Sequence, residues 1–234
     1  PNPRMTRILP RGNWLDETGE EVQPAIPAFF PSDAIEGRRA NRLDLANWIM
    51  SDTNPLTART FVNRMWKLFH GEGISRDLGD LGGQGVPPSH PELLDWLALE
   101  FIRQGWSQKK LLRLIVTSAT YQQRAGTEYR LSAEQIRDSL LSVSGLLHHR
   151  IGGASVFPPQ PGSIGEGIYG GGGWKASSGV DRYRRSLYTY RKRSMPYAMH
   201  DTFDAPSHET CVARREISNT PLQALTLLND PLPI

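Results

Sequence analysis

The tail of the chain holds its densest group of side chains that could perform acid–base or nucleophilic chemistry. His200, Asp204, His208 and Cys211 lie close together in the sequence. A cysteine beside a histidine base, with a carboxylate to orient that base, is an arrangement used for nucleophilic catalysis. The four residues are therefore candidates for a catalytic set. The alternative is structural, because a lone cysteine commonly serves as a small buried residue.

A second candidate site is a metal centre in the middle of the chain. His70 ends one expected helix and His90 begins another, and the connector between them carries Asp77 and Asp80. Imidazole and carboxylate groups that converge in this way can ligate zinc. The alternative is that the histidines are helix-end residues and the aspartates shape turns. No HExxH motif favours the metal.

Basic and aromatic residues alternate along a third stretch. Tyr188, Tyr190, Arg191 and Arg193 lie in the run from Arg184 to Arg193, whose alternation predicts a strand. Such a surface can bind an anionic ligand, either a glycan or a single-stranded nucleic acid. It can equally be a solvated face or pair with acidic neighbours of the same chain.

The Gly-rich segment before this run carries two more aromatic residues. Tyr169 and Trp174 flank the glycines at 170–173. Exposed aromatic rings can serve as stacking platforms for sugars, so both are candidate ligand-binding residues. The glycines do not form a phosphate-binding loop, because the GxxxxGK[ST] pattern is missing.

The composition is that of a water-soluble globular chain. Its 234 residues are 38% hydrophobic and 22% charged, with a formal net charge of +3. Cys211 is the sole cysteine, which excludes an intramolecular disulfide, and no CxxCH run is present to attach haem. No apolar run approaches the roughly 20 residues of a membrane span. We therefore expect no cofactor within this segment and no transmembrane segment.

Helix-start signals divide the central part of the chain into helices. Asn54-Pro55 predicts one start, Gly71 the end of that helix, and Ser107 a further start. Three Ser/Thr-x-x-Glu/Gln patterns predict capping boxes, at 89–92, 132–135 and 220–223. The helix after Ser132 is expected to run to the histidines at 148 and 149.

These elements predict a mainly α fold, with α+β as the alternative. We expect a Pro-rich arm over residues 1–38, a helical core over 39–150, and a Gly-rich loop, basic strand and C-terminal helix over 151–234, with one or two short strands in this last part. The last two parts are expected to form one structural unit. The chain starts at Pro1 and stops soon after a helix, so we interpret it as a fragment whose arm packs on an upstream domain.

Five stretches together resemble a known family. They are ANRLDLANWI, NRMWKLFHGEG, SHPELLDWLA, LLRLIVTSATY and NTPLQALTLLND, which begin at residues 40, 63, 89, 111 and 219. The family is the planctomycete-specific domain of unknown function that follows planctomycete cytochrome c domains in large exported proteins. The resemblance implies an extracytoplasmic or periplasmic module with haem possible in upstream domains. The segment between Tyr121 and Leu131 is shorter than the family pattern.

Three functions follow as hypotheses. The first is a non-catalytic interaction or organising module, whose partners are the upstream domains of the same polypeptide. The second is a hydrolase of extracellular polysaccharide or its esters. The third is a carbohydrate-binding module for a glycan or another anionic ligand. The resemblance implies export, which disfavours nucleic acid as a partner.

Overall fold

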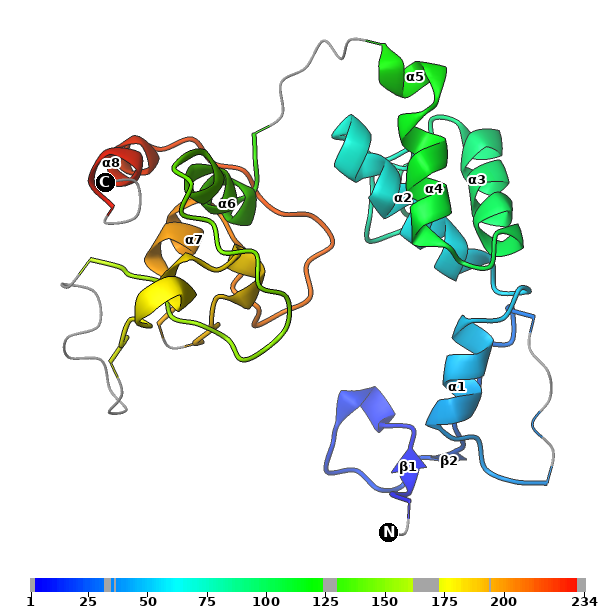
Figure 1. Cartoon of the computed structure of the whole chain (residues 1–234). Helices are drawn as coiled ribbons and strands as arrows, with labels where there is room; N and C mark the ends of the chain where they lie inside the picture. Colours follow the sequence, from blue (N-terminus) through cyan, green and yellow to red (C-terminus); the bar gives the residue numbers. More distant parts are fainter. Residues whose placement is uncertain are drawn as a thin grey trace. The chain divides into compact units, whose positions relative to one another are not determined.

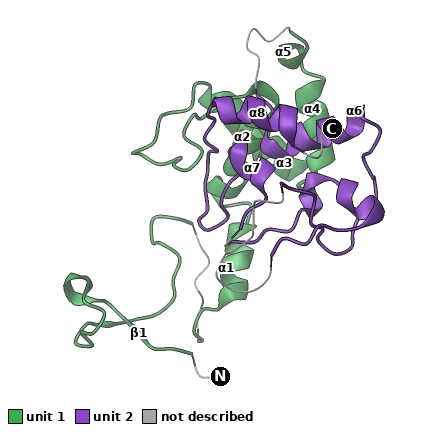
Figure 2. Ribbon diagram, turned by 90° about the vertical axis from the view of Figure 1, so that its left-hand side faces the viewer, with its two compact units in different colours: residues 1–125 green, residues 126–234 purple. Residues whose placement is uncertain are grey.

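The computed structural model describes residues 3–31, 35, 37–123, 130–161, 173–193 and 195–230. In this part the chain is mainly α-helical, as the sequence predicts, and its named strands form one two-stranded sheet (Figure 1). The chain divides into two compact units, residues 1–125 and 126–234, coloured separately in Figure 2. None of the described helices is long and apolar enough to cross a membrane.

The N-terminal arm of the first unit contains a small hairpin. β1 (Thr6–Arg7) pairs antiparallel with β2 (Glu21–Val22), and the 3-10 turn η1 (Pro10–Gly12) lies between them. The end of the arm lies against α1 (Arg42–Ile49), because the Trp48 indole N–H donates to the Pro31 carbonyl at 3.0 Å. Packing of the arm on an upstream domain stays a prediction.

Three helices form the core of the first unit. They are α2 (Pro55–His70), α3 (Pro91–Arg103) and α4 (Gln108–Val116), and the short α5 (Ala119–Gln122) follows them. Each of the three carries apolar residues at helical spacing, so each buries one face against the others. The buried cluster comprises Ala58, Val62, Ile74, Leu94, Leu97, Ala98, Phe101, Leu111 and Ile115.

The predicted ends of α2 are confirmed. The Asn54 side chain accepts hydrogen bonds from backbone N–H groups of the first turn, and Pro55 occupies the first helical position. Gly71 ends the helix with a φ of 78°, a left-handed conformation that glycine adopts without strain. Ser107 caps α4, also as predicted.

The predicted capping box at the start of α3 is wrong. His90 is the N-cap residue of α3, and no side-chain hydrogen bond caps this helix. The Ser89 hydroxyl instead donates to the Ile74 carbonyl at 3.1 Å, and the Ser89 N–H donates to the same carbonyl at 2.8 Å. The Ser89 hydroxyl therefore bonds to the loop after α2 and does not cap α3.

The second unit packs around α6 (Ala133–Val143), α7 (Ala198–Thr202) and α8 (Pro221–Asn229). The predicted capping boxes at the starts of α6 and α8 are confirmed. However, α6 ends at Val143, so His148 and His149 lie beyond it and the predicted helix to these residues is wrong. The buried apolar cluster is formed by Ala133, Leu141, Tyr197, Met199 and Phe203.

Residues 184–193 do not form the predicted strand. The 3-10 turn η3 (Ser186–Tyr188) lies within this run and η2 (Gly179–Tyr183) directly precedes it. Only isolated bridges are present in the run, at Arg184 and Thr189. The Asp138 carboxylate accepts the Ser186 N–H at 2.7 Å. Because that donor is already used, it is not available to a neighbouring strand.

Two buried arginines connect this region to the rest of the second unit. Arg137 on α6 donates to the carbonyls of Arg184 and Arg182 at 2.8 and 3.0 Å. Arg184 in turn donates to the carbonyls of Arg150, Gly152 and Ala154. The two guanidinium groups thus donate the hydrogen bonds that these carbonyls would accept from a neighbouring strand in a β-sheet.

Candidate ligand-binding site

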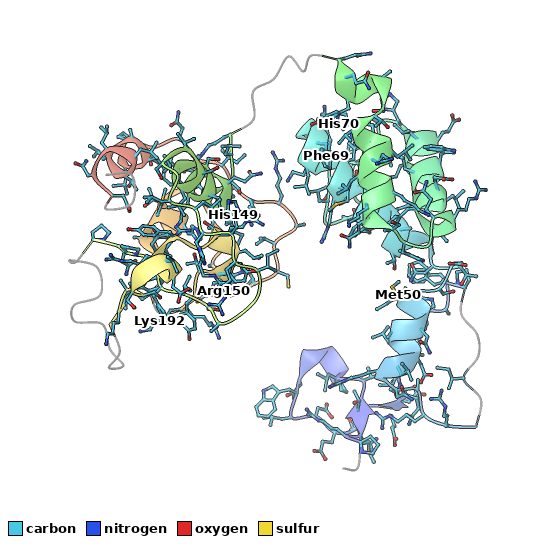
Figure 3. The ribbon with its side chains drawn as sticks, viewed as in Figure 1. Met50, Phe69, His70, His149, Arg150 and Lys192 are labelled. Atoms are coloured by element: carbon cyan, nitrogen blue, oxygen red, sulfur yellow. The ribbon has the colours of Figure 1, made fainter. Side chains whose placement is uncertain are left out.

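The four metal candidates do not form a cluster. His70 lies on the last turn of α2 (Figure 3). Its ring stacks on that of Trp66, with ring centroids 4.0 Å apart. Burial lowers the pKa of His70. Asp77 accepts the N–H groups of Gly79 and Asp80 at 3.0 and 3.1 Å, as turn-forming aspartates do.

The remaining two metal candidates also have local roles. Asp80 accepts the Gly82 N–H at 2.7 Å, and His90 shares a 3.0 Å hydrogen bond with the Ser89 hydroxyl. Within the described ranges, no three His, Cys, Asp or Glu side chains gather as metal ligands would.

The four catalytic candidates are brought together only in part. Asp204 accepts hydrogen bonds from the Ser218 N–H and hydroxyl at 2.9 and 2.7 Å, and lies 3.1 Å from Arg130. Burial opposes ionisation, yet these contacts hold the pKa of Asp204 below its usual value. Cys211 is exposed. His200 and His208 line a cavity that neither Asp204 nor Cys211 lines.

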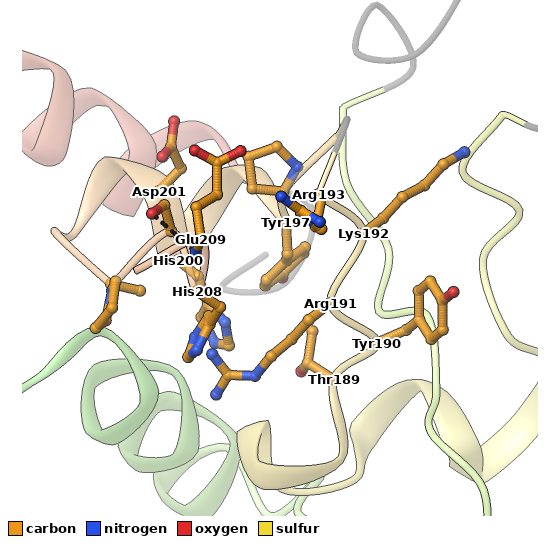
Figure 4. A pocket seen from close by; sticks show the side chains of 14 residues that line it. Thr189, Tyr190, Arg191, Lys192, Arg193, Tyr197, His200, Asp201, His208 and Glu209 are labelled. Carbon is orange, nitrogen blue, oxygen red and sulfur yellow. Dashed lines mark hydrogen bonds between the residues drawn. The ribbon is translucent and has the colours of Figure 1, made fainter. Parts of the chain in front are cut away.

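This cavity lies in the second unit and has a volume of about 120 Å³ (Figure 4). Its lining comes from three segments: residues 189–193, the start of α7 with the residues before it, and residues 205–209. Among the predicted ligand-binding residues, Tyr190, Arg191 and Arg193 line it. The structure therefore joins part of the predicted basic surface to two predicted catalytic histidines.

Three residues that line the cavity each carry a buried polar atom that has no hydrogen-bond partner within the described part of the chain. These atoms are the Thr189 hydroxyl, the Tyr197 hydroxyl and Nε2 of His200. Their residues are only 4%, 2% and 6% exposed. A buried polar atom without a partner costs about 1–3 kcal/mol, so each of these atoms lowers the stability of the fold.

The two titratable groups of this trio are neutral at pH 7. Burial raises the pKa of Tyr197 to about 12, although the nearby Arg137 guanidinium acts in the opposite direction. Burial lowers the pKa of His200 to about 4, although the Glu134 carboxylate acts in the opposite direction. The tyrosine therefore retains its proton as a donor, and the imidazole carries one N–H and one acceptor nitrogen.

Charged side chains of both signs form the walls. Arg193, Asp201 and Glu209 all line the cavity, yet none of the three forms an ion pair or a side-chain hydrogen bond with another described residue. Figure 4 shows Arg191 and Arg193 on one segment and Asp201 and Glu209 on the others. Opposite charges that share a small cavity without pairing leave positions for both signs of a ligand.

Glu134 on α6 holds two arginines near the cavity. Its carboxylate accepts two hydrogen bonds from Arg215, at 2.6 and 3.1 Å, and lies 3.9 Å from Arg191. Burial alone would raise the pKa of Glu134, but these hydrogen bonds and charges lower it to about 2. The ion pair fixes the segment that follows His208 and Glu209 to α6.

The other predicted aromatic platforms are placed differently. Trp174 is half-buried: its indole N–H donates to the Pro158 carbonyl at 2.6 Å and its ring stacks on Tyr197. Tyr188 lies under the Arg184 guanidinium, 3.8 Å from its ring centroid. Tyr190 stacks on Phe157 with ring centroids 4.6 Å apart. Tyr169 lies outside the described residues.

Sequence reasoning missed Thr189, Tyr197, Asp201, Glu209 and Glu134. Tyr197 directly precedes α7, on which His200 and Asp201 lie, and no motif in the sequence marks it. The roles of Thr189 and Glu134 depend on contacts made between distant segments, which leave no local pattern.

Comparison with known proteins gives one match. The model of the family described as PSD1, protein of unknown function (DUF1553), matches residues 41–234. No curated protein matches the chain, and no solved structure does.

Proposed function

Because the chain belongs to the PSD1 family, whose function is unknown, we propose from its own geometry that it is a non-catalytic interaction module that binds an anionic ligand. The observation that carries this proposal is the cavity of the second unit. The consecutive basic residues Arg191, Lys192 and Arg193 border it.

Electrostatics supports an anion as the ligand. Arg191 and Arg193 are exposed and can reach a bound group, and a guanidinium fork matches the oxygens of a carboxylate, sulfate or phosphate. An anion thus meets a concentration of positive charge at this cavity.

The hydrolase hypothesis receives less support from the same geometry. It needs Cys211 beside a histidine base, and Cys211 is exposed and does not line the cavity of His200 and His208. Asp204, the predicted orienting carboxylate, is engaged with Ser218 and Arg130. Binding requires only the groups that do line the cavity.

The wider setting belongs to the proposal too. The resemblance noted from the sequence supports a planctomycete-specific module of a large exported protein, beside cytochrome-type domains that hold haem and act as its partners. Cell fractionation with an antibody to this chain tests the location, and haem absorbance that co-purifies with the full polypeptide tests the association. A purely cytoplasmic pool would contradict export.

Affinity gel electrophoresis tests the binding function. We expect polygalacturonate in the gel to retard the chain at physiological salt, and dextran to leave its mobility unchanged. The double variant Arg191→Gln/Arg193→Gln should lose most of the retardation. Arg182→Gln is the matched control, because Arg182 is an exposed arginine near the same segment that does not line the cavity. Equal retardation of all variants would place anion binding elsewhere.

A further inference from the structure

The outer side of α8 carries leucines that remain exposed in the described part of the chain. Leu222, Leu225 and Leu228 are 59%, 55% and 71% exposed, and Leu227 is 39% exposed. We call these four leucines the α8 face, and we propose that it binds a second copy of this chain. None of the four lines the cavity, so the proposal is independent of the anion-binding function.

The inner side of α8 is polar. Gln223 and Asp230, seven residues apart and therefore on one side of the helix, are 6% and 4% exposed. The Gln223 amide donates to the Thr202 carbonyl at 3.0 Å and to the Ser218 hydroxyl at 3.1 Å. A surface helix ordinarily turns its apolar side to the core. In α8 the arrangement is reversed, and rotating the helix to bury its leucines would break these hydrogen bonds.

The absence of charge on α8 indicates which partner fits. Residues 221–229 contain no Asp, Glu, Lys or Arg. A helix that lies on a membrane surface typically carries Lys or Arg on its polar side, which α8 lacks. Contacts between different proteins are ordinarily oriented by complementary charges, and α8 offers none. An identical uncharged face brings neither repulsion nor an unpaired charge, so a second copy fits best.

A twofold axis is the simplest geometry for this contact. In a twofold dimer the same patch serves on both copies, so contacts are reciprocal. Two α8 helices that pack antiparallel across the axis can pair Leu225 of each copy with Leu228 of the partner subunit. The positive end of each helix dipole then lies beside the negative end of the other, which is favourable.

The size of the α8 face predicts a weak dimer. A helix of nine residues is about 14 Å long and roughly 10 Å across with its side chains. Ile217, four residues before Pro221, is 72% exposed and adds apolar surface to the segment that leads into the helix. This surface is smaller than the roughly 800 Å² per partner of a standard interface, so we expect a dissociation constant on the order of 10–100 µM.

Sedimentation velocity of the whole chain over a range of concentrations tests the proposal. We expect the sedimentation coefficient to rise from that of a monomer to that of a dimer. The variants Leu225→Lys/Leu228→Lys and Leu225→Glu/Leu228→Glu should each weaken association at least about tenfold, because like charges would meet in the contact. Leu187→Lys is the control, because Leu187 is 69% exposed in the same unit but lies outside α8. Circular dichroism checks that each variant is folded.

An equimolar mixture of the Lys and Glu double variants tests whether both copies use the same face. At low salt the mixture should form a heterodimer, seen at the summed mass by native mass spectrometry, because opposite charges then meet across the contact. A mixture that stays monomeric while the wild type dimerises would contradict a contact between two α8 faces.

Two further outcomes would overturn the proposal. A wild-type chain that stays monomeric at every concentration excludes a second copy as the partner. If that monomer then binds phosphatidylcholine vesicles and the Lys double variant does not, a lipid surface is the partner instead. Dimerisation that both double variants retain places the contact on another part of the chain.

Discussion

Glu134 and Arg215, 81 residues apart in the chain, are joined by two hydrogen bonds of 2.6 and 3.1 Å. The carboxylate comes from the first turn of α6 and the guanidinium from the long segment between α7 and α8. This ion pair holds that segment, whose earlier part lines the cavity, against α6.

Glu134→Gln should therefore destabilise the chain in a pH-dependent way. Arg215 is partly exposed, so solvent screening limits the expected loss to roughly 1 kcal/mol at pH 7. The pKa of Glu134 is about 2 in the folded chain against 4.5 ordinarily, so its contribution is present above pH 4.5 and is lost as the pH falls toward 2. Urea unfolding at pH 7 and pH 3 measures this difference.

Glu216→Gln is the matched control for that experiment, because Glu216 is an exposed neighbour of Arg215 without an ion pair to a described residue. A Glu134→Gln effect that is equally large at both pH values would contradict the role of the charge.

His200 should make the second unit sensitive to mild acid. Its pKa is about 4 in the folded chain against 6.5 ordinarily, so below pH 6.5 the unfolded chain takes up the proton first. The shift corresponds to a loss on the order of 3 kcal/mol, complete near pH 4 and absent above pH 6.5. His200→Gln should flatten the dependence of unfolding free energy on pH between 4 and 6.5.

The exposed residue His149 supplies the control for this pH series. His149→Gln should leave the slope of the wild type unchanged. If both variants show the wild-type slope, His200 is not the group that titrates.

Thr189→Val and Tyr197→Phe should leave the fold as stable as before, or raise its stability by up to about 1 kcal/mol. Each change removes a buried polar atom that has no partner in the described chain, and with it the cost of burying that atom. Thermal unfolding without ligand is the measurement. A drop in Tm for both variants would mean that these hydroxyls contribute to the fold through contacts.

Asn63→Ala should strongly lower the stability of the first unit. The buried Asn63 amide donates to the Ser75 carbonyl at 2.9 Å and accepts the Ser75 N–H at 3.0 Å. Its loss leaves two buried backbone groups unsatisfied, at a cost of roughly 2–4 kcal/mol. Denaturant unfolding should show this loss, and Asn229→Ala, at the exposed end of α8, should show much less.

Helix starts could be predicted where the cap is local. Asn54 and Ser132 bond to the helices that they begin, and the chemistry of these few residues decides the outcome. The prediction failed at Ser89 because the Ile74 carbonyl, fifteen residues earlier, competes for its hydroxyl. Propensity is a weak prior wherever a tertiary partner is available.

The charged residues of the candidate site could be predicted from the sequence, but its buried lining residues could not. Arg191, Arg193, His200 and His208 were identified because their types suggest chemistry. Thr189 has an ordinary type, and its significance arises only once its hydroxyl is buried without a partner. The alternating run at 184–193 predicted a strand wrongly, because contacts from Arg137 and Asp138 use its backbone groups.

All the described lining residues of the cavity fall between positions 189 and 209. One continuous stretch of chain thus carries the described lining of the cavity. Glu134 on α6, outside this stretch, holds it in place. Substitutions within this one stretch could then change the ligand preference without any repacking of α6. Grafting this stretch between relatives would transfer specificity wherever the acceptor keeps an acidic residue at the position of Glu134.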